Sequence, residues 1–301
     1  MTSTVDVPTR AVEPAPPVAP RSQAETRPWK RLLRLLALTV LAIAFTYPFL
    51  WLVSASLKPG ELVFDNSLIP DRWAPGNYVT VWREVELLKW LGNSVAVGVA
   101  AAVAATLSSA FVAFGFAYFR FKGRDLLFGL VLATMMLPGA VTMVPVFMEW
   151  NAVGLAATQV PLWAQNLFGS AFYIFLLRQF FRSVSRDMYE AAQLDGAGWL
   201  RVFWSFAVPA VRPALIVVFL LELKASWTDL MKPLIYLRDV DLYTLPLGLK
   251  SVLDRFGTGG ESEWELVMTA SVIATIPMIA LFLVAQRYFI EGANPQQRGR
   301  S

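Results

Sequence analysis

The stretch Glu190-Ala-Ala-Gln-Leu-Asp-Gly-Ala197 is a polar, amphipathic segment that stands between long apolar runs of the sequence. Asp187 suits the N-cap of a helix, and Glu190, three residues later, completes a capping box. Gly196 permits a turn or a close approach by another surface. The stretch therefore predicts a short helix, a break at Gly196 and a second short helix, together covering about residues 187–205.

The overall composition is that of a polytopic membrane protein. Hydrophobic residues make up 56% of the 301 positions and charged residues only 16%, and the mean hydropathy is +0.52. The chain has no Cys and no His, so disulfides and thiolate metal sites are excluded, and the commonest general base and metal ligand is missing. We therefore predict no metal site. The net charge of +4 could indicate nucleic acid, but the basic residues are spread over loops between apolar runs, which favours a role in membrane orientation.

Six apolar runs are each long enough to cross a bilayer as a helix. We predict an all-α membrane protein whose proline-rich residues 1–28 form a disordered tail. The first run has a basic flank, as a signal peptide does, but it exceeds the ~7–15 residues of a signal peptide's apolar region, so we interpret it as an uncleaved span. Polar stretches at 58–89 and 231–265 are predicted to lie outside the membrane. The predicted spans are about residues 32–57, 90–119, 126–147, 161–181, 211–230 and 266–285.

The distribution of Lys and Arg predicts the orientation of the chain. With six spans both termini lie on one side, and that side carries most of the basic residues, including Arg178, Arg182 and Arg186. The positive-inside rule makes this side cytoplasmic. Segment 187–205 is therefore predicted to face the cytoplasm, where its acidic residues favour a protein partner over an anionic lipid surface.

Two of the runs carry residues that shape a helix bundle. The second run contains small residues such as Gly98, Ala102 and Ala113, which permit close helix packing. Pro138 and Pro145 lie seven residues apart in the third run, and each removes a backbone hydrogen bond. Bends at these prolines would serve a gate or shape the bundle, and the spacing alone does not distinguish the two.

Charged side chains occur in or near the fifth span. Because intramembrane charge is expensive and marks a functional site by default, Glu222, Lys224 and Asp229 are candidates for a translocation path. The alternative is that Glu222 and Lys224 bond neighbouring groups or line a cavity wall, since residues two apart do not share a helix face. Trp227 is a further candidate because it could stack on a sugar ring, although aromatic residues near span ends are more often interfacial anchors.

No catalytic chemistry is predicted for this chain. It has no Gly-x-x-x-x-Gly-Lys-Ser/Thr motif, so nothing in it cradles nucleotide phosphates, and ATP would have to be hydrolysed by another chain. A Ser/His or Cys/His nucleophile pair is impossible without His or Cys. The competing classes are an intramembrane hydrolase using Ser and Lys, and a self-sufficient secondary transporter or channel. A secondary transporter should show internal repeats, and none is evident.

The opening stretch also resembles a known family. It resembles the EAA loop of bacterial ABC importer permeases. The resemblance lies in the spacing Glu-Ala-Ala, two residues, Asp-Gly-Ala, five residues and Phe203, followed by Pro209 and Pro213. In that family the loop forms a cytoplasmic coupling helix that docks into a groove of the ATPase subunit. The resemblance implies these ATPase-coupling residues: Glu190, Ala191, Ala192, Asp195, Gly196, Ala197, Arg201, Phe203 and Pro209.

The resemblance covers most of the chain after residue 30 and is greatest to the carbohydrate-importer permeases. Residues 175–181 are similar to the end of that family's fourth span. Phe206 and Val208 stand where the family usually has Ile and Leu, and Ser185 replaces a Pro that is common before the coupling helix. The family's usual closing Gly-Ala-Val-Lys-Gly is absent at the C-terminus.

This resemblance implies a type I ABC importer permease fold and a non-catalytic subunit in the bacterial cytoplasmic membrane. The implied partners are a second homologous permease, a dimer of ATPase subunits, an external solute-binding protein and membrane lipid. ATP and Mg²⁺ would bind to the ATPase subunits, and no cofactor would bind to this chain. The implied substrate is a sugar or oligosaccharide, and no nucleic acid is expected as a partner.

Overall fold

The computed structural model describes residues 28–256 and 263–292, and every regular element in these two ranges is a helix. The chain divides into two compact units, Met1–Phe49 and Leu50–Ser301, each of which is described by itself. The boundary falls within helix α1, Pro28–Ser56. The predicted N-terminal tail lies outside the described residues except for Pro28, where α1 begins.

Three helices are long and apolar enough to cross a membrane, and three bent helix pairs reach the same criterion when each pair is taken together. Counting each bent pair as one span gives the six spans expected for this chain. The long segments are Trp29–Ser56, Leu87–Tyr118 and Trp264–Leu283, which belong to α1, α3 (Leu87–Tyr118) and α14 (Trp264–Gly292). The bent pairs are α4 (Arg124–Thr134) with α5 (Gly139–Ala152), α6 (Val160–Ala164) and η2 (Gln165–Phe168) with α7 (Ala171–Ser183), and α9 (Trp199–Val202) through α10 (Val208–Ala210) with α11 (Arg212–Trp227).

The third predicted span is not one continuous helix. Helices α4 and α5 meet at an angle of 98°, and the break ends at Pro138, which takes an extended conformation as the N-cap of α5. A proline disfavours helical geometry in the residue before it and has no N–H to donate, so a helix tends to end at this position. Pro145, by contrast, lies inside α5 without interrupting it. Only one of the two predicted bends is therefore a break.

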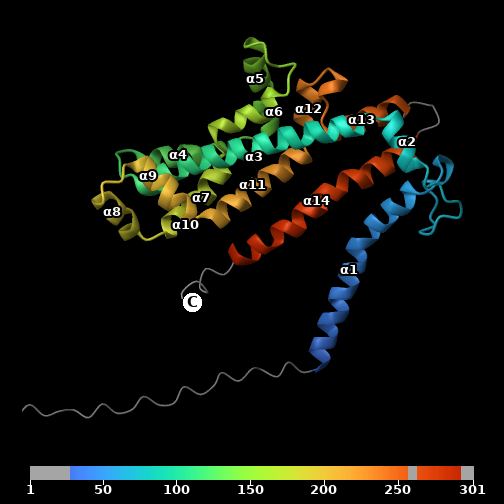
Figure 1. Ribbon diagram of the computed structural model, residues 1–301, viewed down its shortest axis with the longest axis horizontal. Helices are drawn as coiled ribbons and strands as arrows, with labels where there is room; N and C mark the ends of the chain where they lie inside the picture. Colours follow the sequence, from blue (N-terminus) through green and yellow to red (C-terminus); the bar gives the residue numbers. More distant parts are fainter. Residues whose placement is uncertain (1–27, 257–262, 293–301) are drawn as a thin grey trace, which may run out of the picture. The chain divides into compact units, whose positions relative to one another are not determined.

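Helix α3 forms the centre of the second unit, with α7 and α11 packed along it (Figure 1). The small residues of α3 make this packing possible, because Gly98, Ala102 and Ala113 are all buried. A Cβ atom placed on Gly98 would lie only 3.0 Å from Cδ1 of Leu223 in α11. The predicted role of these residues in close helix packing agrees with this arrangement.

The polar stretches predicted to lie outside the membrane contain short helices. They cover one end of α3, where Trp90 is buried. The indole ring of Trp90 packs against the backbone of Gly248, so closely that a Cβ atom at position 248 would overlap the ring. Lys58, between α1 and η1, is also buried. It donates to the carboxylate of Asp65, which lowers the pKa of Asp65, and to the carbonyl oxygen of Ser67 at 2.6 Å. The short helices are η1 (Gly60–Leu62), α2 (Asn77–Glu84), α12 (Met231–Tyr236), η4 (Val240–Leu242) and α13 (Leu245–Phe256).

Candidate functional site

The amphipathic segment begins with helix α8, Arg186–Leu194, whose N-cap is Ser185. The Ser185 hydroxyl oxygen accepts a hydrogen bond from the backbone N–H of Asp187 at 3.3 Å. The expectation that Asp187 is the N-cap was therefore wrong, because the chain becomes helical one residue before it. Asp187 lies instead in the first turn, where a negative charge still interacts favourably with the helix dipole. Ser185, which stands where the resembled family often has a proline, thus supplies a capping hydroxyl.

Helix α8 ends at the predicted break. Gly196 has a φ of 79°, in the left-handed region that glycine adopts without the steric penalty of a Cβ atom. Its N–H donates to the carbonyl of Gln193 at 2.9 Å, and the N–H of Ala197 donates to the carbonyl of Ala192 at 3.0 Å. These two bonds form a Schellman motif, which satisfies the last carbonyls of the helix and turns the chain. The predicted turn at Gly196 is confirmed.

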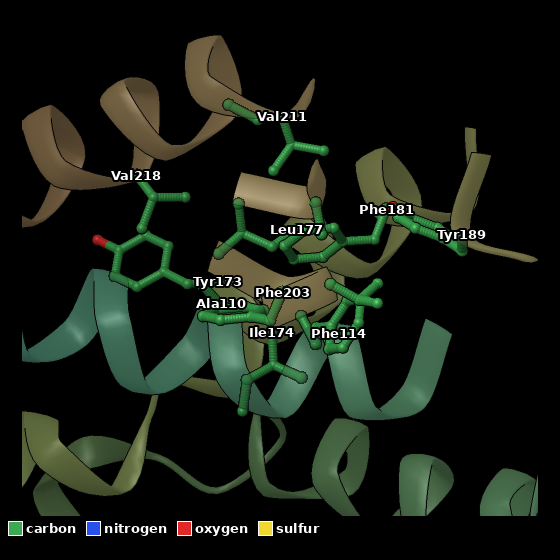
Figure 2. Packing of buried hydrophobic residues seen from close by; sticks show 14 of the residues in the cluster. Ala110, Phe114, Tyr173, Ile174, Leu177, Phe181, Tyr189, Phe203, Val211 and Val218 are labelled. Carbon is green, nitrogen blue, oxygen red and sulfur yellow. The ribbon is translucent and has the colours of Figure 1, made fainter. Parts of the chain in front are cut away.

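One face of α8 is buried against the end of α3. Tyr189 and Ala192 are buried, and the Tyr189 ring packs edge-on against Tyr118 at 5.4 Å between centroids. Figure 2 labels Tyr189 among the residues of this buried cluster. Burial raises the pKa of Tyr189 to about 12, because the charged phenolate loses its hydration. A guanidinium nitrogen of Arg186 also donates to the carbonyl oxygen of Tyr118 at 3.3 Å. Arg186 and Tyr189 therefore attach helix α8 to the end of α3.

The second part of the segment is attached by Phe203, which is 1% exposed. Its ring centroid lies 4.9 Å from that of Phe111 and 5.2 Å from that of Phe114, both in α3, and 6.5 Å from that of Phe181 in α7. Figure 2 shows Phe203 with Phe114 and Phe181 in this cluster. After the short helix α9 the chain forms a π-helical turn, η3 (Phe203–Ala207), rather than a regular second helix. The structure thus places Ala192 and Phe203, two of the predicted coupling residues, in the core of this chain.

The opposite face of the segment is exposed. Leu194 is an apolar side chain that is 89% exposed, although it stands in a polar part of the chain. Trp199 and Leu200 are about half exposed. Ala197 is half-buried at the turn. Six exposed residues form a surface that we call the outer face of the segment: Glu190, Ala191, Gln193, Leu194, Asp195 and Arg201.

A sharp bend joins this segment to α11. Pro209 lies in α10, Pro213 lies in the first turn of α11, and the axes on either side of Val211 differ by 81°. Both prolines lack a backbone N–H, so each removes a hydrogen bond from the chain at this point. The first turn of a helix tolerates this loss, which allows α11 to begin immediately after the bend.

The carboxylate of Glu222 is bound within the helix bundle. Its Oε1 accepts a hydrogen bond from Nδ2 of Asn166 in η2 at 2.7 Å. The carbonyl oxygen of Asn166 accepts from the hydroxyl of Ser108 in α3 at 2.8 Å, and the hydroxyl oxygen of Ser109 accepts from the N–H of Ser170 at 3.1 Å. We call these contacts the intramembrane network. They connect α11, α3 and the break between η2 and α7. Asn166 was not predicted as a functional residue, although an amide inside an apolar run was visible in the sequence.

The remaining candidates of the fifth span do not meet at one site. Trp227 is buried in a core cluster that includes Trp90 and Leu245, so it packs against this chain. Lys224 is exposed. Asp229 follows the end of α11, and its carboxylate accepts from the N–H of Lys232 at 3.2 Å and lies 3.6 Å from Lys232 Nζ. Within residues 28–256 and 263–292, no group of three or more Asp, Glu, His or Cys is placed to hold a metal ion.

These features define an all-helical, multi-pass membrane protein. Residues 105–293 match the family described as the binding-protein-dependent transport system inner membrane component. The chain is 33% identical over 255 residues to the probable ABC transporter permease protein YurM of Bacillus subtilis (strain 168), covering 83% of this chain and 82% of YurM. It is 28% identical over 282 residues to the arabinooligosaccharides transport system permease protein AraQ of Halalkalibacterium halodurans, covering 89% of this chain and 96% of AraQ.

The fold is also found in a solved structure. A crystal structure of a bacterial ABC transporter involved in the import of the acidic polysaccharide alginate contains a chain that superposes with a TM-score of 0.77. The superposition covers 91% of this chain and 100% of that one, at 24% identity. The fold is therefore that of a type I ABC importer permease, and the chain belongs to the family of binding-protein-dependent transport system inner membrane components.

Proposed function

We propose that this chain is the permease subunit of an ATP-driven, binding-protein-dependent importer in the bacterial cytoplasmic membrane, with both termini in the cytoplasm. It would form half of the translocation path. A second homologous permease would form the other half, and an external solute-binding protein would deliver the substrate. ATP and Mg²⁺ would bind to a dimer of separate ATPase subunits. The carbohydrate-transport name of AraQ, and the alginate transporter that shares the fold, support a sugar or oligosaccharide as the substrate.

The observation that carries this proposal is the outer face of segment 186–202. Tyr189, together with Phe203 directly after the segment, holds it to α3 and α7, yet Leu194 exposes most of its apolar side chain beside acidic and amide groups. A surface leucine surrounded by polar groups on an anchored helix is the pattern of an anchor residue that enters a groove of a protein partner. Because the sequence contains no nucleotide-binding motif, an active importer that includes this chain needs a separate ATPase subunit as its partner.

The proposed coupling follows the contacts from this face inward. Motion of the ATPase subunit would pull α8, and the aromatic contacts of Phe203 would transmit the displacement to the ends of α3 and α7. The bend between Pro209 and Pro213 would convert it into a tilt of α11. Because Glu222 binds Asn166, the tilt of α11 would also move the break in the fourth span. This sequence of contacts would switch access from the outside to the inside.

The test is retention of the ATPase subunit by the purified permease. We expect Leu194→Asp to release the ATPase subunits in detergent and to abolish binding-protein-stimulated ATP hydrolysis and uptake. Leu68→Asp is the matched control, because Leu68 is also an exposed leucine but lies in the stretch predicted to face the outside. That variant should retain the ATPase subunits. Normal retention by Leu194→Asp, or sugar uptake driven by an ion gradient without any ATPase, would contradict the proposal.

A further inference from the structure

The turn between α3 and α4, residues 119–123, carries a concentration of positive charge. Arg120 and Lys122 are exposed in this turn, and Arg124 follows as the first residue of α4. Within residues 28–256 and 263–292, no carboxylate forms an ion pair with Arg120 or Lys122. A pocket of about 390 Å³ lies at the turn, and Arg120 and Arg124 line it. We call it the basic pocket.

The negative charge at the basic pocket is already neutralised. Asp125 is the acidic residue among the described residues that line it. Oδ1 of Asp125 lies 3.2 Å from Nε of Arg124 and 3.9 Å from Nη2 of Arg178 in α7. The guanidinium of Arg178 is held in place, because the side chain is buried with its Cζ 3.9 Å from the ring centroid of Phe128. One carboxylate is therefore shared between two guanidinium groups, and the pocket keeps a net positive charge.

An apolar groove of about 430 Å³ begins at the same turn and shares Arg120 and Phe121 with the basic pocket. It runs back along the last turns of α3 to Val112, a distance of roughly 12 Å at the rise of an α-helix. Gly115 is part of its lining. Apart from the two chain neighbours of Gly115 and the backbone of α3, no described atom lies within 4 Å of the place where a Cβ would stand. The groove is therefore open along the helix surface, next to a positively charged pocket.

The combination of a basic pocket and an adjoining apolar groove selects a class of ligand. A guanidinium group binds phosphate oxygens through two parallel hydrogen bonds, and basic pockets between membrane helices on the cytoplasmic side bind anionic lipid headgroups. A free phosphate would leave the groove unused. A zwitterionic lipid would bring its own positive charge to a pocket that is already positive. An anionic phospholipid matches both parts, because its phosphate and its acyl chain are joined in one molecule.

We propose that the α3–α4 turn binds one anionic phospholipid of the cytoplasmic leaflet, with its phosphate at Arg120 and Arg124 and an acyl chain in the groove beside Gly115. The proposal rests on the proposed function for the side of the membrane that the turn faces. The turn lies at the same end of α3 as α8 and α9 (Figure 1). Phe119 lines the groove and also packs against Trp199 of α9, with 6.4 Å between ring centroids. A lipid bound here therefore stabilises the end of α3 to which the amphipathic segment is attached.

The test is thermal unfolding of the full chain in a nonionic detergent, with dioleoyl phosphatidylglycerol, dioleoyl phosphatidylcholine or inorganic phosphate as the probe. A ligand that binds only the folded state raises the unfolding temperature by mass action. We expect phosphatidylglycerol to raise it in a saturable way and the other two probes to leave it unchanged. An equal rise with phosphatidylcholine would mean that the groove binds lipid without selecting charge. An equal rise with inorganic phosphate would mean that the pocket is an anion site without a lipid. Either result overturns the proposal.

Substitution of the two pocket arginines separates a defined site from a diffuse attraction. Arg120→Gln combined with Arg124→Gln should raise the half-stabilising amount of phosphatidylglycerol about thirtyfold, or about fivefold for each charge removed. The matched control is Arg31→Gln combined with Arg34→Gln, two exposed arginines of α1 that are predicted to face the same side. This control should change the amount less than about twofold, as expected for a charge outside the site. Equal weakening by both pairs would show that the lipid responds only to the charge of this side, and would overturn the site.

Filling the groove tests the apolar half of the site. Gly115→Leu should raise the half-stabilising amount about tenfold, the effect of losing the burial of roughly two methylene groups. Gly92→Leu is the matched control, because Gly92 lies at the other end of α3 and its Cβ position is also open. An unchanged response in Gly115→Leu would overturn the groove as the binding place. Since the assay contains neither ATP nor a partner subunit, its failure removes only the lipid site, whereas selective lipid binding by a chain that transports without an ATPase supports the site and removes the importer.

Discussion

Polar side chains point outward on the outer face of segment 186–202 and inward in the intramembrane network. On the segment, Glu190, Gln193 and Asp195 point away from the chain, and aromatic rings hold the other face. In the helix bundle, Glu222 and Asn166 point toward each other. Polar groups can face outward where water or a protein partner can satisfy them, whereas in a lipid environment they must be satisfied within the protein. The direction in which a polar side chain points therefore separates a docking surface from an internal connection.

The largest expected effect tests whether the two faces of the segment have separate tasks. Phe203→Ala should reduce stability by about 3–5 kcal/mol, because it removes a buried ring from the contact with α3 and α7. Leu194→Ala should change stability by no more than about 0.5 kcal/mol, since the side chain is exposed, yet it should weaken retention of the ATPase subunit. Thermal unfolding in detergent and copurification measure the two effects. A large loss of stability in Leu194→Ala would show that the division between the faces is wrong.

The next effect tests the internal connection. Glu222→Ala should reduce stability by about 1–3 kcal/mol, because the amide of Asn166 would lose its 2.7 Å bond to the carboxylate and keep only the 3.4 Å bond to the carbonyl oxygen of Ala101. Glu222→Gln keeps an acceptor oxygen and serves as the control with a smaller loss. A double-mutant cycle with Asn166→Ala should give a coupling energy of about 0.5–3 kcal/mol. Additive losses would mean that Glu222 and Asn166 act independently.

A smaller effect is expected at the turn of the segment. Gly196→Ala should reduce stability by about 1–2 kcal/mol, because an L-residue with a Cβ atom is strained in the left-handed conformation. No other atom of the described chain lies within 4 Å of that Cβ position, so backbone strain is the only expected cost. Ala191→Gly, at an exposed position of the same helix, is the control for a change in helix propensity. Equal unfolding temperatures for wild type and Gly196→Ala would contradict the Schellman turn.

The smallest effect is a pH dependence of the buried face. Burial raises the pKa of Tyr189 to about 12, above the value of about 10 for a free tyrosine. Since the folded-state pKa is raised, the associated stability is fully present below pH 10 and is lost as the pH rises toward 12. The tyrosinate absorbance of wild type minus that of Tyr189→Phe should show one group titrating near the upper end of this range. Titration of that group near pH 10 would indicate that the face is solvated.

Much of the segment could be predicted because its signals are local. A glycine after an amphipathic stretch predicts a left-handed helix end, and Gly196 adopts one. The N-cap was predicted at Asp187 and lies at Ser185, because two capping residues stand two positions apart and local chemistry does not choose between them. In the third run the two prolines were equivalent in the sequence. Only Pro138 coincides with a break, since Pro145 lies where the remaining hydrogen bonds of α5 keep the helix intact.

The sequence by itself determined that this protein is a helical membrane protein with one polar amphipathic segment, because hydropathy and helix-end chemistry are properties of neighbouring residues. Only the tertiary structure decided which groups meet. It showed that Trp227 packs in a core cluster and that Ala192 and Phe203 anchor the segment. It also brought Glu222 to Asn166, 56 positions away in the chain. Contacts at such separations depend on how the helices pack, and no pattern within either helix contains that information.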